Sequence, residues 1–160
     1  MKKVFCILFV LPLLLSSCAA SPSPLGYQEN VTRAVCTLET GGGTYKVEIT
    51  PGAAVKILEP EELSGVTLSL DGEKYTLASG GMALDLPQAL IPLITPILNA
   101  FSLPAHDAKT STSGDDTRVV KVGARAGDYE IKLNPDGTPG EISYKGVREF
   151  TLTDIKIVGY

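Results

Sequence analysis

The chain has 160 residues and a formal net charge of −4, and 44% of its residues are hydrophobic, 6% aromatic and 20% charged. This length and composition are typical of one globular domain with a hydrophobic core. The excess of acidic side chains argues against binding to nucleic acid, because nucleic-acid phosphates carry the same sign of charge.

Residues 1–17 have the features of a secretory signal peptide. Lys2 and Lys3 give a positive start, and an apolar run follows from Val4 to Leu15. The run is too short for a stable membrane span and closes with small residues, as signal peptides do before their cleavage site. An uncleaved anchor helix is the alternative, and the length of the run disfavours it.

The signal ends in Leu15-Ser16-Ser17-Cys18, which resembles the lipobox of bacterial lipoproteins. The resemblance implies that the Cys18 thiol receives a diacylglyceryl group and becomes the first mature residue. Two or three acyl chains hold a protein durably on a bilayer, since each buried methylene contributes about 0.8 kcal/mol. We therefore expect a protein anchored to the cell membrane on its extracytoplasmic side. The alternative is a cysteine that lies by chance near an ordinary cleavage site.

Residues 18–30 are rich in Ser, Pro and Gly, which predicts a flexible tether between the lipid and the domain. Without Lys2 and Lys3 of the signal, 12 basic residues face 18 acidic residues, a net charge of −6. Such a chain is repelled by anionic head groups, so the lipid rather than the charge accounts for tethering.

Residues 31–160 are predicted to form a single domain of short antiparallel strands. Apolar and polar residues alternate in many short segments, and Gly, Pro, Asn or Asp separate these segments. The clearest hairpin runs from Val66 to Leu77, with Asp71-Gly72 as its turn. In the last segment the apolar positions change phase between Leu152 and Ile155. A β-bulge near Thr153-Asp154 is therefore expected.

Residues 84–103 interrupt the alternation with an apolar stretch that contains Pro87, Pro92 and Pro96. Pro87 suits the first turn of a helix, whereas an interior proline removes a donor and costs about 3 kcal/mol. One or two short, kinked helical turns are therefore expected. The stretch is interpreted as a core plug, as a lid over an apolar cavity or as an exposed docking segment. Its candidate cavity or lid residues are Leu90, Leu93, Ile94, Ile97, Leu98 and Phe101.

The remaining features give little support to catalysis or metal binding. Residues 104–117 are polar and predict a mobile loop, which contains His106, the one histidine of the chain. Nothing beside His106 fixes it as a catalytic base. Cys36 lies on the apolar face of a predicted strand and is expected to be a buried small hydrophobe. We therefore expect no enzymatic activity, no metal site and no cofactor besides the lipid on Cys18.

Two patterns carry a further resemblance. The first is the hairpin from Val66 to Leu77, which leads into the apolar stretch; the second runs from Tyr129 through Asp136-Gly137 and Pro139 to Ile142. Both resemble the half-barrel of the LolA and LolB lipoprotein carriers. The resemblance implies a mainly β fold, in which a curved antiparallel sheet of about nine or ten strands is covered by one short Pro-kinked helical segment.

The resemblance also implies a function. We expect an envelope lipoprotein that binds lipid acyl chains or lipoproteins in an apolar concave cavity. The alternative is a lipid-tethered module that binds another envelope protein and has a filled core without a small ligand. A surface-coating lipoprotein without a specific ligand is the third interpretation.

Overall fold

The computed structural model describes residues 23–72, 74–113, 117–124 and 127–158. In these residues eleven strands form one antiparallel sheet in the order β6-β5-β4-β3-β2-β1-β11-β10-β9-β8-β7. The strands are β1 (Arg33–Thr40), β2 (Gly43–Thr50), β3 (Ala54–Glu59), β4 (Thr67–Asp71), β5 (Lys74–Ser79), β6 (Met82–Asp85), β7 (Ala108–Thr112), β8 (Arg118–Ala124), β9 (Gly127–Leu133), β10 (Pro139–Gly146) and β11 (Phe150–Val158). The mainly β prediction is confirmed, although the sheet has more strands than expected.

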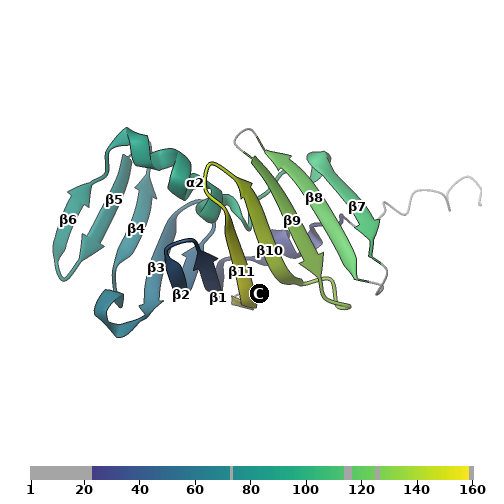
Figure 1. The fold of residues 1–160 in the computed structure, drawn as a ribbon, viewed down its shortest axis with the longest axis horizontal. Helices are drawn as coiled ribbons and strands as arrows, with labels where there is room; N and C mark the ends of the chain where they lie inside the picture. The colour runs from purple at the N-terminus through teal and green to yellow at the C-terminus, as the bar shows by residue number, and fades with distance from the viewer. Residues whose placement is uncertain (1–22, 73, 114–116, 125–126, 159–160) are drawn as a thin grey trace, which may run out of the picture.

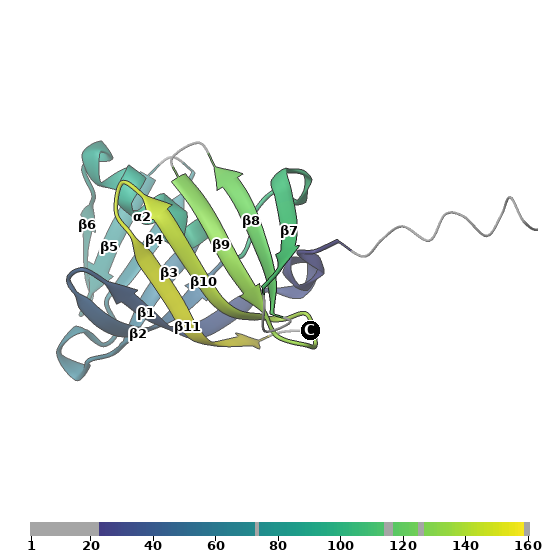
Figure 2. The ribbon, with the colours of Figure 1, turned by 45° about the vertical axis from the view of Figure 1, so that its right-hand side comes forward.

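The sheet consists of two halves that meet where β1 pairs with β11. The N-terminal half-sheet comprises β1 to β6 and the C-terminal half-sheet comprises β7 to β11, each in chain order (Figure 1). The pairing runs from Arg33 opposite Val158 to Thr40 opposite Phe150. Strands β6 and β7 are free edges, so the sheet stays open rather than closing into a barrel. Figure 2 shows the sheet curving so that its two halves face each other across the α2 helix.

One α-helix and four short 3-10 helices complete the described structure. They are η1 (Gly26–Asn30), η2 (Glu61–Leu63), η3 (Gln88–Leu90), α2 (Ile91–Asn99) and η4 (Ala105–Asp107). The predicted apolar stretch thus contains the end of β6, then η3 and α2. Pro92 lies in the first turn of α2, where a missing N–H costs nothing, and Pro96 lies inside the helix. No helix among the described residues is long and apolar enough to span a bilayer.

The hydrophobic core packs against the concave face of the C-terminal half-sheet. Inward-facing side chains of β8, β9 and β10, including Val120, Ile131 and Ile142, are fully buried. The residues that follow α2 pack on them, with Phe101 and Leu103 exposing 1% and 5% of their surface. Alternation of apolar and polar residues along these strands therefore gives one buried face and one solvated face.

Leu25 and η1 pack against this core, which differs from the tether that was expected for this part of residues 18–30. Leu25 is only 2% exposed and belongs to the core. The side-chain amide of Gln28, oriented to satisfy both of its groups, donates to Leu103 O at 2.8 Å and accepts from Leu103 N at 3.1 Å. Figures 1 and 2 both place η1 beside the C-terminal half-sheet. Burial of Leu25 and the two hydrogen bonds of Gln28 contribute to the ordering of this short segment.

Part of the predicted mobile loop over residues 104–117 forms the edge strand β7. Its residues pair with β8 from Ala108 opposite Val122 to Thr112 opposite Arg118. Four of its five residues are exposed, because an edge strand in this position buries neither face. The sequence Ala-Lys-Thr-Ser-Thr therefore lacks the alternation from which a strand is predicted.

The predicted β-bulge in the last strand is confirmed at Asp154. Val35 lies opposite Lys156, whereas Thr37 lies opposite Thr153, so two residues of β11 face the single residue Cys36. Asp154 has a positive φ of 51°, which Asp tolerates better than most residues. The hydroxyl of Thr37 donates to Asp154 Oδ2 at 3.1 Å. The bulge restores the inward-facing phase along β11.

Candidate ligand-binding cavity

An apolar cavity of about 270 Å³ lies between α2 and the N-terminal half-sheet. Its walls are side chains from β1 to β5, from α2 and from the segments beside them: Leu38, Tyr45, Val47, Val55, Ile57, Val66, Leu68, Leu77, Leu86, Ile94 and Ile97. Leu38, Val47 and Val55 are buried and form the floor, whereas the other eight lining residues are half-buried. The cavity is therefore open to solvent rather than sealed.

The strand register brings the sheet residues of the cavity onto one face. Leu38 lies opposite Tyr45, and Val47 opposite Ile57. Val55 lies opposite Leu68, which in turn lies opposite Leu77. Directly opposite residues of antiparallel strands share a face of the sheet. The alternation seen in the sequence thus produces a continuous apolar floor across five strands.

Three hydrogen bonds to other elements, and one within the helix, fix the position of α2. The hydroxyls of Tyr75 and Thr95 lie 2.7 Å apart, and Thr95 Oγ1 also donates to Ile91 O at 2.8 Å. The N–H of Gly52 donates to Leu98 O at 3.0 Å. From the other half-sheet, Tyr129 Oη donates to Pro96 O at 2.8 Å. The helix is thus attached at several points along its length, while Ile94 and Ile97 leave the space beneath it unfilled.

The structure places five of the six predicted cavity or lid residues, and these five lie in three different environments. Ile94 and Ile97 line the cavity. Leu98 and Phe101 are 0% and 1% exposed and belong to the core. Leu90 is 37% exposed at the end of η3. The side chain of Leu93, like the whole of Cys18, lies outside the described residues.

Sequence reasoning did not name the sheet residues that form most of the cavity wall. The signal for them was present, because they occupy the inward-facing positions of the alternating segments. Alternation identifies the buried face of a strand, yet it does not distinguish a position packed against a neighbour from one that borders a cavity. That distinction depends on the height of α2 above the sheet.

The cavity offers little polar chemistry to a ligand. Its one polar side chain, Tyr45, donates to Gly42 O at 3.3 Å. No group of His, Cys, Asp and Glu residues in the described part of the chain is arranged to hold a metal ion. His106 is exposed on η4, with Nε2 3.2 Å from Asp107 Oδ2. Such a cavity can hold an aliphatic chain and selects for little else.

Cys36 is buried on the concave side of β1, as expected. It is 2% exposed, and burial raises the pKa of its thiol to about 12. Removal from water disfavours the thiolate, and within the described part of the chain no cation offsets this effect. A thiol with this pKa is unreactive at neutral pH, so Cys36 serves as a small hydrophobic side chain.

No protein-family model matches the chain, and no curated protein matches it. Among solved structures, the chain is similar to a LolA superfamily protein from Nitrosomonas europaea, with 11% identity over 82% of this chain and 86% of that chain and a TM-score of 0.40. An uncharacterized conserved protein from Thermus thermophilus is 13% identical over 86% and 85% of the two chains, with a TM-score of 0.44.

The chain is also similar to the lipoprotein LppX of Mycobacterium tuberculosis. Here the identity is 14% over 84% of this chain and 94% of that chain, with a TM-score of 0.43. Because each of these TM-scores lies below 0.5, the function is inferred from the cavity and the sequence of the chain itself.

Proposed function

We propose that the protein is an envelope lipoprotein, anchored through a lipid on Cys18, that binds an acyl chain in the cavity beneath α2. The observation that supports this proposal is the unfilled apolar space between α2 and β1 to β5. Its volume of about 270 Å³ lies just below the range of about 300–1,000 Å³ that is typical of small-molecule sites. This size suits one chain rather than several. Each methylene that enters contributes about 0.8 kcal/mol.

The position of the chain before β1 fits an anchored protein. Residues Leu25 to Asn30 lie against the C-terminal half-sheet, whereas the cavity lies under the N-terminal half-sheet. A membrane anchor that precedes Leu25 therefore joins the domain away from the cavity. In this proposal the anchor positions the domain at the bilayer, and the cavity takes a lipid chain without competing with the anchor for space.

The proposal assigns no enzymatic activity to the protein. Its support is the apolar lining of the cavity, in which the one hydroxyl is engaged with a backbone carbonyl. A general base must lie within hydrogen-bond reach of the atom on which it acts. His106 does not line the cavity.

Native mass spectrometry of residues 19–160 with palmitate tests the binding proposal. This fragment keeps every buried residue of the described structure, since the core extends from Leu25 to Leu152. We expect the fragment to retain one palmitate. Leu68→Trp fills the cavity and is expected to abolish retention.

Met82→Trp is the matched control. Met82 lies on β6, two residues from Leu84, which faces the cavity residue Leu77 across the strand pair. Met82 therefore shares the concave face with the cavity, yet it is 77% exposed and does not line it. This variant is expected to bind like the wild type. Failure of the wild-type fragment to retain any fatty acid would favour the protein-binding alternative.

Metabolic labelling with palmitate tests the anchor. The full chain is expected to incorporate the label and to fractionate with membranes, because the lipobox implies acylation of Cys18. Cys18→Ala removes the acceptor thiol and is expected to abolish both. Labelling that persists in Cys18→Ala would contradict the assignment of the attachment site.

A further inference from the structure

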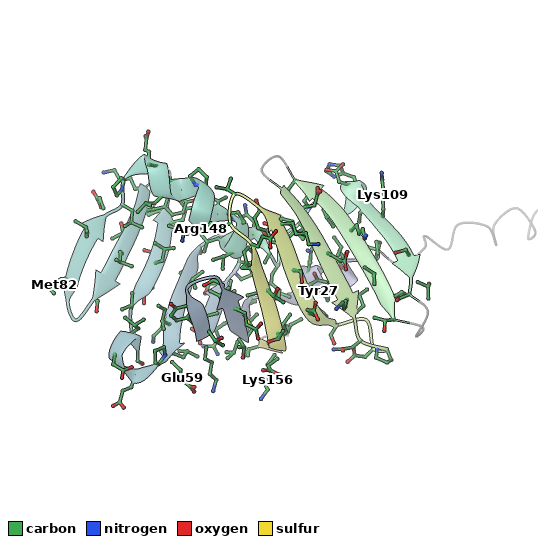
Figure 3. All side chains as sticks on the ribbon, viewed as in Figure 1. Tyr27, Glu59, Met82, Lys109, Arg148 and Lys156 are labelled. Carbon is green, nitrogen blue, oxygen red and sulfur yellow. The ribbon has the colours of Figure 1, made fainter. Side chains whose placement is uncertain are left out.

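A second, more polar depression adjoins the apolar cavity. Tyr45 and Ile97 line both the cavity and a second depression of about 700 Å³. The other walls of this depression are the β1–β2 turn, at residues 40–42, and the β10–β11 turn, at Arg148 and Glu149. Ile97 of α2 lines the depression together with both turns, which lie near α2 in Figure 1, and Figure 3 labels Arg148 near the second turn. A ligand whose chain fills the cavity thus places its other end between these turns.

The backbone and hydroxyl groups of the β1–β2 turn are used within the turn. The N–H of Gly42 donates to Thr40 Oγ1 at 3.1 Å, and Tyr45 Oη donates to Gly42 O at 3.3 Å. Thr40 Oγ1 donates to Gly43 O at 3.3 Å. Both hydroxyl groups of the depression are therefore engaged within the turn, and its charged side chains are Arg148 and Glu149 of the opposite turn.

Arg148 and Glu149 lack the oppositely charged partners that several charged residues on the strands have. On the strands, Arg33 pairs with Glu48 at 3.2 Å, and Lys132 pairs with Glu141 at 2.9 Å. Among the residues that the structure describes, neither Arg148 nor Glu149 lies within 4.0 Å of an oppositely charged group, including each other. The depression thus presents one free cation and one free anion beside an apolar cavity.

We propose that the ligand is a single-chain amphiphile with a zwitterionic head group, such as a lysophospholipid. This inference rests on the proposed acyl-chain function and names the head group that accompanies the chain. The phosphate contacts Arg148, whose planar guanidinium matches phosphate geometry. The ammonium contacts Glu149, and the acyl chain passes Tyr45 and Ile97 into the cavity.

Other head groups use this pair of charges less completely. The carboxylate of a fatty acid can pair with the guanidinium of Arg148, but it is repelled by the carboxylate of Glu149. A cationic amphiphile can pair with Glu149 but is repelled by Arg148. A neutral monoacylglycerol makes neither charge contact. Because both side chains are exposed, each charge contact changes affinity by only about two- to fivefold. The preference for a zwitterion is therefore modest but measurable.

The test compares four probes that carry the same saturated chain, each below its micelle concentration. They are a lysophosphatidylcholine, a fatty acid, an alkyltrimethylammonium and a monoacylglycerol, titrated calorimetrically into residues 19–160. We expect the lysophosphatidylcholine to bind tightest, by about two- to fivefold over the singly charged probes. Arg148→Gln is expected to remove this advantage and to favour the cationic probe. Glu149→Gln is expected to remove the advantage of the lysophosphatidylcholine and to favour the fatty acid.

Lys109→Gln is the matched control, because Lys109 is an exposed cation on β7, at the opposite edge of the sheet from β6 (Figure 3). It is expected to leave the ranking of the four probes unchanged. If all four probes bind equally to the wild type, or if Lys109→Gln changes the ranking as Arg148→Gln does, the head-group inference is overturned while acyl binding stands. If no probe binds, the acyl-chain function itself fails, and this inference fails with it.

Discussion

The hydroxyl of Tyr129 on β9 donates a hydrogen bond of 2.8 Å to the carbonyl of Pro96 in α2. Carbonyls in the last turn of a helix lack intrahelical donors, and Tyr129 supplies a donor for this one. Tyr75 of β5 holds the same helix from the opposite half-sheet through Thr95. The helix is thus tied to both halves of the sheet by tyrosine hydroxyls, and its height above the cavity depends on them.

Tyr129→Phe is expected to lower the free energy of unfolding by about 1–3 kcal/mol, because it leaves a buried carbonyl without a donor. The ring contact with Tyr144, at a centroid distance of 4.8 Å, is retained in this variant. Urea denaturation measures the change. The control is Tyr45→Phe, which removes an exposed bond of 3.3 Å and is expected to cost under about 0.5 kcal/mol. Equal effects of the two substitutions would contradict the role assigned to Tyr129.

Leu25→Ala is expected to destabilise the domain by about 2–5 kcal/mol, the usual cost of truncating a buried leucine. Leu25 is 2% exposed, although it precedes the first strand by eight positions. Thermal unfolding followed by circular dichroism measures the loss. The control is Glu29→Ala, because Glu29 is an exposed residue of η1, the 3-10 helix that directly follows Leu25. An unchanged midpoint in Leu25→Ala would show that the segment before β1 does not contribute to the core.

Asp154→Val is expected to cost about 1–2 kcal/mol, because a β-branched residue is strained at a φ of 51°. Asp154→Asn keeps both the tolerance for this conformation and an acceptor for the Thr37 hydroxyl, so it is expected to be nearly neutral. The comparison is made by chemical denaturation. A similar loss in both variants would indicate that the carboxylate charge, rather than the backbone conformation, matters at the bulge.

Cys36 predicts a loss of stability at alkaline pH. Burial raises the pKa of the folded thiol to about 12 from an ordinary 9.0. Between these values the unfolded thiol ionises while the folded thiol stays protonated, so the stability that the raised pKa represents falls as pH rises. The slope reaches about 1.4 kcal/mol per pH unit. In Cys36→Ala this contribution is absent, and its denaturation midpoint is expected to fall less steeply between pH 9 and 11.

Part of the fold was predictable because alternation of apolar and polar residues marks strands with one buried face. The hairpin from Val66 to Leu77 forms β4 and β5 as expected, although Asp71 ends β4 and pairs with Lys74, so the turn begins at Gly72 rather than at Asp71. The phase change between Leu152 and Ile155 predicted the bulge at Asp154. In both cases a few neighbouring residues carry the whole signal, so no knowledge of distant packing was needed.

The remaining features depend on contacts between distant segments. Leu25 lies in a stretch whose composition is typical of a linker, and only its burial in the core reveals its role. Strand β7 has no apolar period because it is an edge. The cavity depends on how far α2 lies from the sheet, which Tyr75, Gly52 and Tyr129 set together. Periodicity within one segment does not record such distances.

The two half-sheets differ in packing: the C-terminal half-sheet covers a packed core under β8 to β10, and the N-terminal half-sheet borders an unfilled space under β1 to β5. A ligand that enters the cavity under the N-terminal half-sheet contacts side chains that are already half-buried. The packed core of the C-terminal half-sheet does not depend on that ligand. Loading and unloading therefore need not pass through global unfolding. When a ligand binds, amide hydrogen exchange is expected to slow in β2 to β5 and to stay constant in β8 to β10. The half-sheet that holds the ligand and the half-sheet that holds the core are then separate parts of the fold.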